Sequence, residues 1–124
     1  MKILFVPNCK TDDPEYVFST ERVLRCLGIS GKLTGFPYAI YMIERIISEP
    51  SSIQLITKNL YPETAKKFGV STVSVERTIR TIVKACWKNE DHDFLDYISG
   101  AHLEQCPTNS EFLDLVAGYL RAMR

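Results

Sequence analysis

Three charged side chains stand where they could recognise a base pair. Glu76 and Arg77 are adjacent, and Arg80 follows four residues after Glu76 and three after Arg77. In a helix, residues at these spacings share one face. A guanidinium group can donate two hydrogen bonds to O6 and N7 of guanine, and a carboxylate can accept one from the amino group of cytosine. The segment therefore predicts contact with the edges of DNA bases.

The elements that must position these side chains are the two helices of a helix-turn-helix, predicted over residues 64–80, TAKKFGVSTVSVERTIR. Ala65 is expected inside the first helix and Gly69 in the turn, where a residue without Cβ fits best. Val70 should pack in the turn, and Val75 should face inward from the second helix. This spacing leaves an outer face on the second helix, formed by Ser71, Thr72, Val73, Glu76, Arg77 and Arg80.

The predicted contacts with double-stranded DNA are of two kinds. Contacts with phosphates give affinity without sequence preference, whereas contacts with base edges give specificity. The N–H groups at the start of the second helix also favour a phosphate. An ion pair with Arg80, four residues later, is the alternative role for Glu76. The expected base contacts are Val73, Glu76, Arg77 and Arg80, and the expected phosphate contacts are Lys66, Lys67, Ser71, Thr72, Ser74 and Lys84.

Charge is distributed unevenly along a chain whose net charge is zero. Residues 57–88 contain seven bases and two acids, whereas residues 89–114 contain seven acids and no lysine or arginine. A basic block that coincides with a helix-turn-helix is typical of phosphate binding. Two ordinary solvated surfaces are the alternative explanation. We expect the acidic block to face away from DNA.

The 124 residues suit one domain with a single core. No apolar run is long enough to span a membrane, and the apolar segment 2–6 is too short for a signal peptide. We therefore expect a cytoplasmic protein without a membrane partner. Cys9, Cys26, Cys86 and Cys106 have no regular spacing, which favours reduced thiols over a disulfide framework.

The apolar periodicity predicts an all-α fold: a compact bundle of about six helices, with a short extended N-terminal segment. The expected domain covers residues 14–124, preceded by an extension over residues 1–13. Its first helix should begin at Asp13 and end at Gly28, and its last should begin with a capping box of Thr108 and Glu111. The other expected helices are Pro37–Glu49, a short one capped by Ser51 or Ser52 and extending to Leu60, one opened by Tyr61-Pro62, Thr72–Lys88 and Phe94–Ile98.

Two helices have clear buried faces at three- and four-residue spacing. The aromatic residues Tyr38, Tyr41, Tyr61 and Trp87 are also expected to pack in or over the core. The buried face of the second motif helix should be Val75, Ile79, Ile82, Val83 and Cys86, and that of the last helix Phe112, Leu113, Val116, Leu120 and Met123.

From about residue 15 onward, the chain resembles the C-terminal DNA-binding effector domain of the master sporulation response regulator of endospore-forming Firmicutes. The likeness rests on ITKNLYPETAKKF (56–68), SVERTIR (74–80), Trp87 and PTNSEF (107–112). It implies a six-helix domain that binds short DNA boxes at sporulation and stationary-phase promoters. Residues matching the family's base-contacting Glu-Arg pair are Glu76 and Arg77, and those matching its DNA-facing basic residues are Lys66, Lys67 and Arg80.

The resemblance also implies further partners. Residues 89–106 correspond to the family's polymerase-contacting surface, which would bind RNA polymerase or a sigma factor, but here they are shorter and more acidic. These 124 residues leave no room for the family's receiver domain. We therefore expect a monomer that binds paired boxes cooperatively, through a small contact near Tyr119 and Arg121.

Two other classes of function were weighed. A protein-interaction module or antagonist would keep the helix-turn-helix but bind a full-length sporulation regulator or RNA polymerase. A metal-dependent enzyme is disfavoured, because His92, His102 and Cys106 fit no zinc pattern and Asp91-His92-Asp93 has no recognisable nucleophile beside it. The chain also has no Gly-rich phosphate loop. The sequence therefore predicts no enzymatic activity, no metal and no cofactor.

Overall fold

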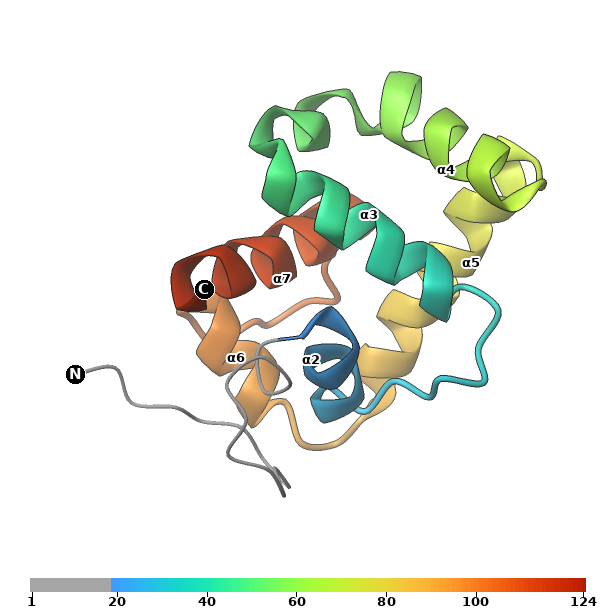
Figure 1. Cartoon of the computed structure of the whole chain (residues 1–124). Coiled ribbons are helices and arrows are strands. Elements are labelled where there is room, and N and C mark those ends of the chain that lie inside the picture. The colour runs from blue at the N-terminus through green and yellow to red at the C-terminus, as the bar shows by residue number, and fades with distance from the viewer. Residues whose placement is uncertain (1–18) are drawn as a thin grey trace.

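Helices form all the regular structure in residues 19–124, the part of the chain that the computed structural model describes (Figure 1). No helix in this range is long and apolar enough to cross a membrane. In chain order the elements are α2 (Thr20–Cys26), α3 (Phe36–Ser48), a 3₁₀ helix η1 (Pro50–Leu55), a single π turn η2 (Ile56–Leu60), α4 (Tyr61–Phe68), α5 (Thr72–Lys88), α6 (Asp93–Ser99) and α7 (Asn109–Met123). The predicted all-α bundle is confirmed.

Helix α3 lies at the centre of the fold and contacts α2, α4, α5 and α7. Its Met42, Ile43 and Ile46 are fully buried, as helical spacing of apolar residues requires. Helices α3 and α7 lie side by side in Figure 1, and Phe112 and Val116 of α7 belong to the same hydrophobic cluster. Helices α4 and α5 both pack against this shared core.

Helix α5 has the bounds expected from the sequence, and its buried residues are the five predicted ones. The middle of α5 lies against the start of α3 at Gly35. A Cβ at Gly35 would lie 2.8 Å from the carbonyl oxygen of Thr78, so glycine allows the two backbones to approach. The position of α5 is thus fixed by close packing along its inner side.

The first described helix is shorter than the predicted one. Helix α2 begins at Thr20, with Ser19 as its N-cap, and ends at Cys26, with Leu27 as its C-cap and Gly28 next at a φ of 85°. The side-chain oxygen of Ser19 accepts a hydrogen bond from the backbone N–H of Arg22, at 3.1 Å. The predicted N-cap Asp13 and the extension over residues 1–13 lie outside the described residues.

The segment between α3 and α4 differs from the short capped helix predicted there. Residues 50–55 form a 3₁₀ helix and residues 56–60 a π turn, and neither has a side-chain cap. Neither Ser51 nor Ser52 caps a helix, so that prediction was wrong. Pro50 has no N–H to donate to a helical hydrogen bond. The two short turns that follow bring Leu60 to a buried position at the start of α4.

Helix α7 confirms the predicted capping box and corrects one expectation about its surface. The backbone N–H of Glu111 donates to Thr108 Oγ1 at 3.2 Å, and the backbone N–H of Thr108 donates to Glu111 Oε1 at 3.0 Å. Tyr119, expected at a contact between copies, is only 7% exposed and packs edge-on against Phe94. Tyr119 therefore belongs to the core, whereas Arg121 is exposed.

Candidate nucleic-acid interface

The turn between α4 and α5 has the geometry that a helix-turn-helix needs. Gly69 ends α4 in the left-handed conformation, with φ of 68° and ψ of 36°. A Cβ there would meet nothing within 4 Å, so backbone conformation, not space, calls for glycine. The N–H of Val70 donates to the carbonyl of Ala65 at 3.0 Å, and Val70 packs against the core. The predicted roles of these three residues are confirmed.

The start of α5 is capped by Ser71. Its side-chain oxygen accepts a hydrogen bond from the N–H of Ser74 at 3.1 Å. The first turn contains no acidic residue, although acids are favoured at helix N-termini. The positive end of the helix dipole is therefore left without a carboxylate from its own first turn.

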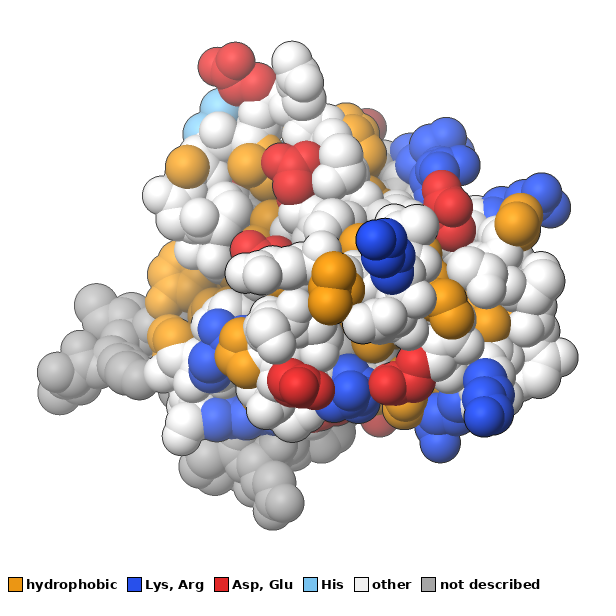
Figure 2. All heavy atoms as spheres, turned by 90° about the horizontal axis from the view of Figure 1, so that it is seen from above, with side chains coloured by type: hydrophobic (Ala, Val, Ile, Leu, Met, Phe, Trp, Pro, Cys, Tyr) orange, Lys and Arg blue, Asp and Glu red, His pale blue; other side chains and the backbone are white. Residues whose placement is uncertain are grey.

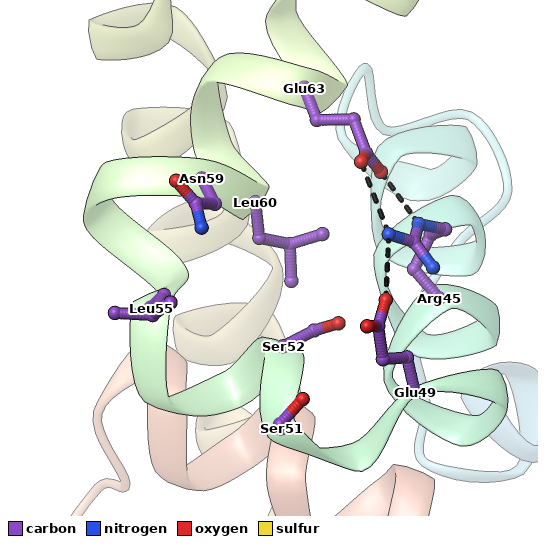
Figure 3. A pocket seen from close by; sticks show the side chains of 8 residues that line it. All are labelled: Arg45, Glu49, Ser51, Ser52, Leu55, Asn59, Leu60 and Glu63. Atoms are coloured by element: carbon purple, nitrogen blue, oxygen red, sulfur yellow. Dashed lines mark hydrogen bonds and ion pairs between the residues drawn. The ribbon is translucent and has the colours of Figure 1, made fainter.

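A network of polar side chains fixes α4 on α3. Glu63 Oε2 accepts hydrogen bonds from Arg45 Nε and from the Tyr41 hydroxyl, both at 2.7 Å, and Arg45 Nη2 donates to Glu63 Oε1 at 3.2 Å. Figure 3 shows Arg45 between Glu63 and Glu49, beside a pocket of about 260 Å³ that Leu55 and Asn59 also line. The Arg45 guanidinium and the Tyr41 hydroxyl lower the pKa of Glu63. The carboxylate is therefore held in its ionised form.

A second polar contact joins both motif helices to the start of α7. The side-chain amide of Asn109 donates to the Tyr61 hydroxyl oxygen and to the backbone carbonyl of Glu76, each at 3.1 Å. Tyr61 is buried on α4, and its burial raises the pKa of its hydroxyl. One amide thus fixes the position of α4 relative to α5, which the sequence did not indicate.

The outer side of α5 presents the predicted base-contacting residues to solvent. Val73 is 62% exposed, and Arg77 is exposed, four residues further along the same side. The Arg77 guanidinium makes no hydrogen bond or ion pair with any residue of the range 19–124 that the structure describes. The structure therefore brings Val73 and Arg77 together on a face that is open to a partner.

Glu76 and Arg80 form an ion pair, which was the alternative role for Glu76. Arg80 Nη2 lies 2.6 Å from Glu76 Oε1, and both side chains are about half exposed. Such an exposed pair contributes little to stability, and its members can separate when another partner approaches. Both residues remain on the outer side of α5 beside Arg77.

The predicted phosphate-contacting residues surround this face. Lys66 and Lys67 are exposed in the last turn of α4, and Ser71, Thr72 and Ser74 form the start of α5. Lys67 Nζ lies 5.3 Å from the centre of the Tyr41 ring and 5.9 Å from that of Phe68, within cation–π range. Lys67 therefore has a packing role in addition to its charge.

Lys84 lies further along α5, at the edge of a surface pocket of about 440 Å³. Glu76 and Arg80 line the pocket from α5, and the segment Cys106–Ser110 lines it from the start of α7. All the predicted contact residues thus lie on α4 or α5, and the pocket marks where this surface meets α7.

Figure 2 shows lysine and arginine side chains in two groups toward the right of the view, with acidic side chains among them. The acidic residues that follow α5, Glu90, Asp91 and Asp93, are exposed. A helix of 17 residues, the length of α5, spans about 25 Å, so these acids lie far from the N-terminus of α5. Part of the acidic block seen in the sequence therefore lies away from the start of α5.

The histidines near this acidic end have structural partners. His92 Nε2 lies 2.7 Å from the carbonyl oxygen of Trp87, and the two rings stack with centres 4.3 Å apart. His102 Nδ1 lies 2.8 Å from Asp96 Oδ2. Residues 19–124 bring together no three histidine, cysteine or acidic side chains that could hold a metal ion. Trp87 is half-buried, consistent with the lid role expected for it.

The comparison with known families agrees with this geometry. Residues 20–120 match the family described as sporulation initiation factor Spo0A C terminal. The matched range includes every described helix up to the last turn of α7. The family consists of DNA-binding transcription factor domains and not of enzymes. The chain therefore belongs to the Spo0A C-terminal family.

Proposed function

We propose that this protein is a sequence-specific transcription regulator of sporulation or stationary-phase genes, which places the N-terminal half of α5 in the major groove of DNA. The observation that supports this most directly is the exposed, unpartnered Arg77 guanidinium on the outer side of α5, within the described residues. Its forked donors match O6 and N7 of guanine. The absence of acids from the first turn of α5 lets that end approach the duplex.

The remaining contacts are assigned by their distance from the helix start. Val73, Glu76, Arg77 and Arg80 contact base edges, since N-terminal residues of a recognition helix lie deepest in the groove. Lys84 lies about 16 Å further along the axis than Val73, more than the groove's width of about 12 Å, so it contacts phosphate at the edge. The other phosphate contacts are Lys66, Lys67, Ser71, Thr72 and Ser74.

The domain responsible is residues 14–124, with residues 1–13 as an extension, in the cytoplasm. The acidic segment 89–106 begins where α5 ends and is available to RNA polymerase or a sigma factor. Its exposed acids, Glu90, Asp91 and Asp93, suit a basic partner surface.

Two copies on adjacent DNA boxes would double the length of the recognised site, and a single recognition helix contacts only a few base pairs. We assign the contact between copies to the exposed side of α7 at Arg121, since Tyr119 is buried. Sedimentation of the protein without DNA should show a monomer, and a two-box duplex should bind more tightly per box than a one-box duplex. A tight dimer without DNA, or equal affinity per box, contradicts this assembly.

A selection of DNA sequences by the purified protein tests the proposal. We expect the wild-type protein to enrich one short box, and Arg77→Ala to enrich the same box without its preference at one G·C pair. If no sequence is enriched, but the protein binds RNA polymerase or a full-length sporulation regulator, and still does so after Arg77→Ala and Lys66→Ala, then it is a protein-interaction module.

A further inference from the structure

We infer that Val73 determines specificity by contacting the C5-methyl group of a thymine, one or two base pairs from the guanine that Arg77 contacts. The inference rests on the proposed function and adds a named base to the site. It is carried by the exposure of Val73, by its polar surroundings and by its spacing from Arg77.

The exposure of Val73 has no explanation in the fold. It is the second residue of α5, and at 62% it is more exposed than Leu55 or Tyr97, the other large exposed apolar residues described. Val75, two residues later, is fully buried and supplies the core contact of this turn. A β-branched residue also lowers helix propensity slightly, so neither packing nor local preference favours valine at this position.

The surroundings of Val73 argue against a docking site for another protein. Its chain neighbours Thr72 and Ser74 are polar, and Arg77 lies one turn away on the same side. A protein-binding surface is usually a contiguous apolar patch. A single isopropyl group among hydroxyl groups and a guanidinium instead suits a partner with one methyl group set among hydrogen-bonding atoms.

The major groove presents such a partner. Among the base edges of the groove, thymine alone carries a methyl group, and the base pairs otherwise differ there in their hydrogen-bond donors and acceptors. Valine cannot donate or accept a hydrogen bond through its side chain, so it cannot recognise those atoms. Contact with the thymine methyl removes both apolar groups from water.

The spacing of the two residues sets the register between the two bases. Val73 and Arg77 are four residues apart, which is about 6 Å along the helix axis. Successive bases of one strand are about 3.4 Å apart along the duplex. With α5 following the groove, the thymine is therefore one or two base pairs from the guanine.

Single replacement of each thymine in the selected box by deoxyuridine tests the inference, because deoxyuridine lacks only the C5-methyl group. We expect one replacement to weaken wild-type binding about three- to fivefold, the size expected for one buried methyl group. That thymine should lie within two base pairs of the position whose preference Arg77→Ala abolishes. Val73→Ala should bind the thymine and deoxyuridine duplexes equally.

Leu55→Ala is the matched control, since Leu55 is also exposed but lies in η1, away from α5. It should keep the full thymine preference. Both variants should unfold at the wild-type temperature, which excludes misfolding as the cause of any loss.

The outcomes separate this inference from the proposed function. A selected box in which no deoxyuridine matters, or in which it matters equally for Val73→Ala, overturns the inference and leaves the proposed function standing. Absence of any enriched sequence overturns both.

Discussion

Glu76 and Arg80 form an ion pair on the exposed side of α5, with Arg80 Nη2 2.6 Å from Glu76 Oε1. In the proposed complex each of the two residues contacts a base, for which Glu76 keeps its second carboxylate oxygen and Arg80 its other N–H groups. Arg77 is adjacent to Glu76 in the chain but takes no part in the pair. Without DNA, and within the described part of the chain, Arg80 is therefore paired with a carboxylate, whereas Arg77 is not.

Glu76→Ala should change specific and random DNA binding in opposite directions. Loss of the acceptor for a cytosine amino group should weaken the selected box by about 1 kcal/mol, with relaxed preference at one C·G pair. Random DNA should bind more tightly, because a carboxylate is removed from beside the phosphates and Arg80 is released. Titrations of both duplexes at one salt concentration measure the two effects.

The control for this prediction is Glu21→Ala, which removes the same kind of pair from α2, where Arg25 Nη2 lies 3.0 Å from Glu21 Oε1. Each variant should lose less than about 0.5 kcal/mol of stability, as is usual for exposed pairs four residues apart. Only Glu76→Ala should affect DNA binding. Weakening of both duplexes by Glu76→Ala would mean that Glu76 acts only by holding Arg80.

Arg77→Ala should cost about 1–3 kcal/mol on the selected box and remove the preference at one G·C pair. Arg77→Lys keeps the positive charge but loses the forked donors, so it should retain random binding and lose the preference. On a one-box duplex, where no second copy binds alongside, Arg121→Ala, which removes an exposed arginine from α7, is the control for charge. Sequence preference that survives in Arg77→Ala would show that another part of α5 lies in the groove.

Lys66→Ala and Lys67→Ala should each weaken selected and random DNA alike and reduce the salt dependence of binding by about one unit of slope. They should differ in stability. Lys67 lies over the Tyr41 and Phe68 rings, so its loss should cost about 0.5–1 kcal/mol, whereas Lys66 makes no such contact within residues 19–124. Binding isotherms over a salt series and urea unfolding test the two parts. An effect confined to one sequence would assign these lysines to bases instead.

Glu63→Gln should destabilise the protein at pH 7 by about 1 kcal/mol, a value reduced for the partial exposure of Arg45 and Glu63. Arg45 and Tyr41 lower the folded-state pKa of Glu63. The ionised carboxylate therefore stabilises the folded state above the unfolded pKa of about 4.3, and this contribution disappears as the pH falls through the folded pKa. The difference from wild type should vanish in acid.

Glu49→Gln is the matched control for Glu63→Gln, because Glu49 also pairs with Arg45, but at 3.3 Å and with a side chain that is 60% exposed. Thermal unfolding between pH 7 and pH 3 compares the two variants. A Glu63→Gln deficit that stays constant down to pH 3 would show that the amide, and not the lost charge, causes the instability.

Local patterns in the sequence were sufficient for the elements that carry the candidate site. The three- and four-residue spacing gave the bounds of α5 and its buried face, since this spacing fixes which side of a helix meets the core. Gly69 and the capping box of Thr108 and Glu111 were predicted because each acts within a few residues. The predicted contact residues all lie on α4 and α5, but their contacts with DNA remain predictions.

Features that depend on distant residues were not predictable in the same way. Residues 50–60 have helical spacing of apolar side chains, but the spacing does not distinguish 3₁₀, α and π hydrogen bonding over one or two turns. The partners Arg45 and Glu63 are 18 residues apart, and Asn109 is 48 residues from Tyr61. Tyr119 was expected near a contact between copies, yet it is buried and packs against Phe94 of α6.

The amide of Asn109 has a consequence for how this domain can be reused. It joins Tyr61 of α4 and the Glu76 carbonyl of α5 to the first turn of α7, so a residue outside the motif helps to hold the angle between the motif helices. If residues 60–88 were moved to another scaffold, they would lose the two hydrogen bonds from Asn109. The helix-turn-helix of this protein is therefore not a portable unit, and any chimera that keeps its DNA preference must include the C-terminal helix.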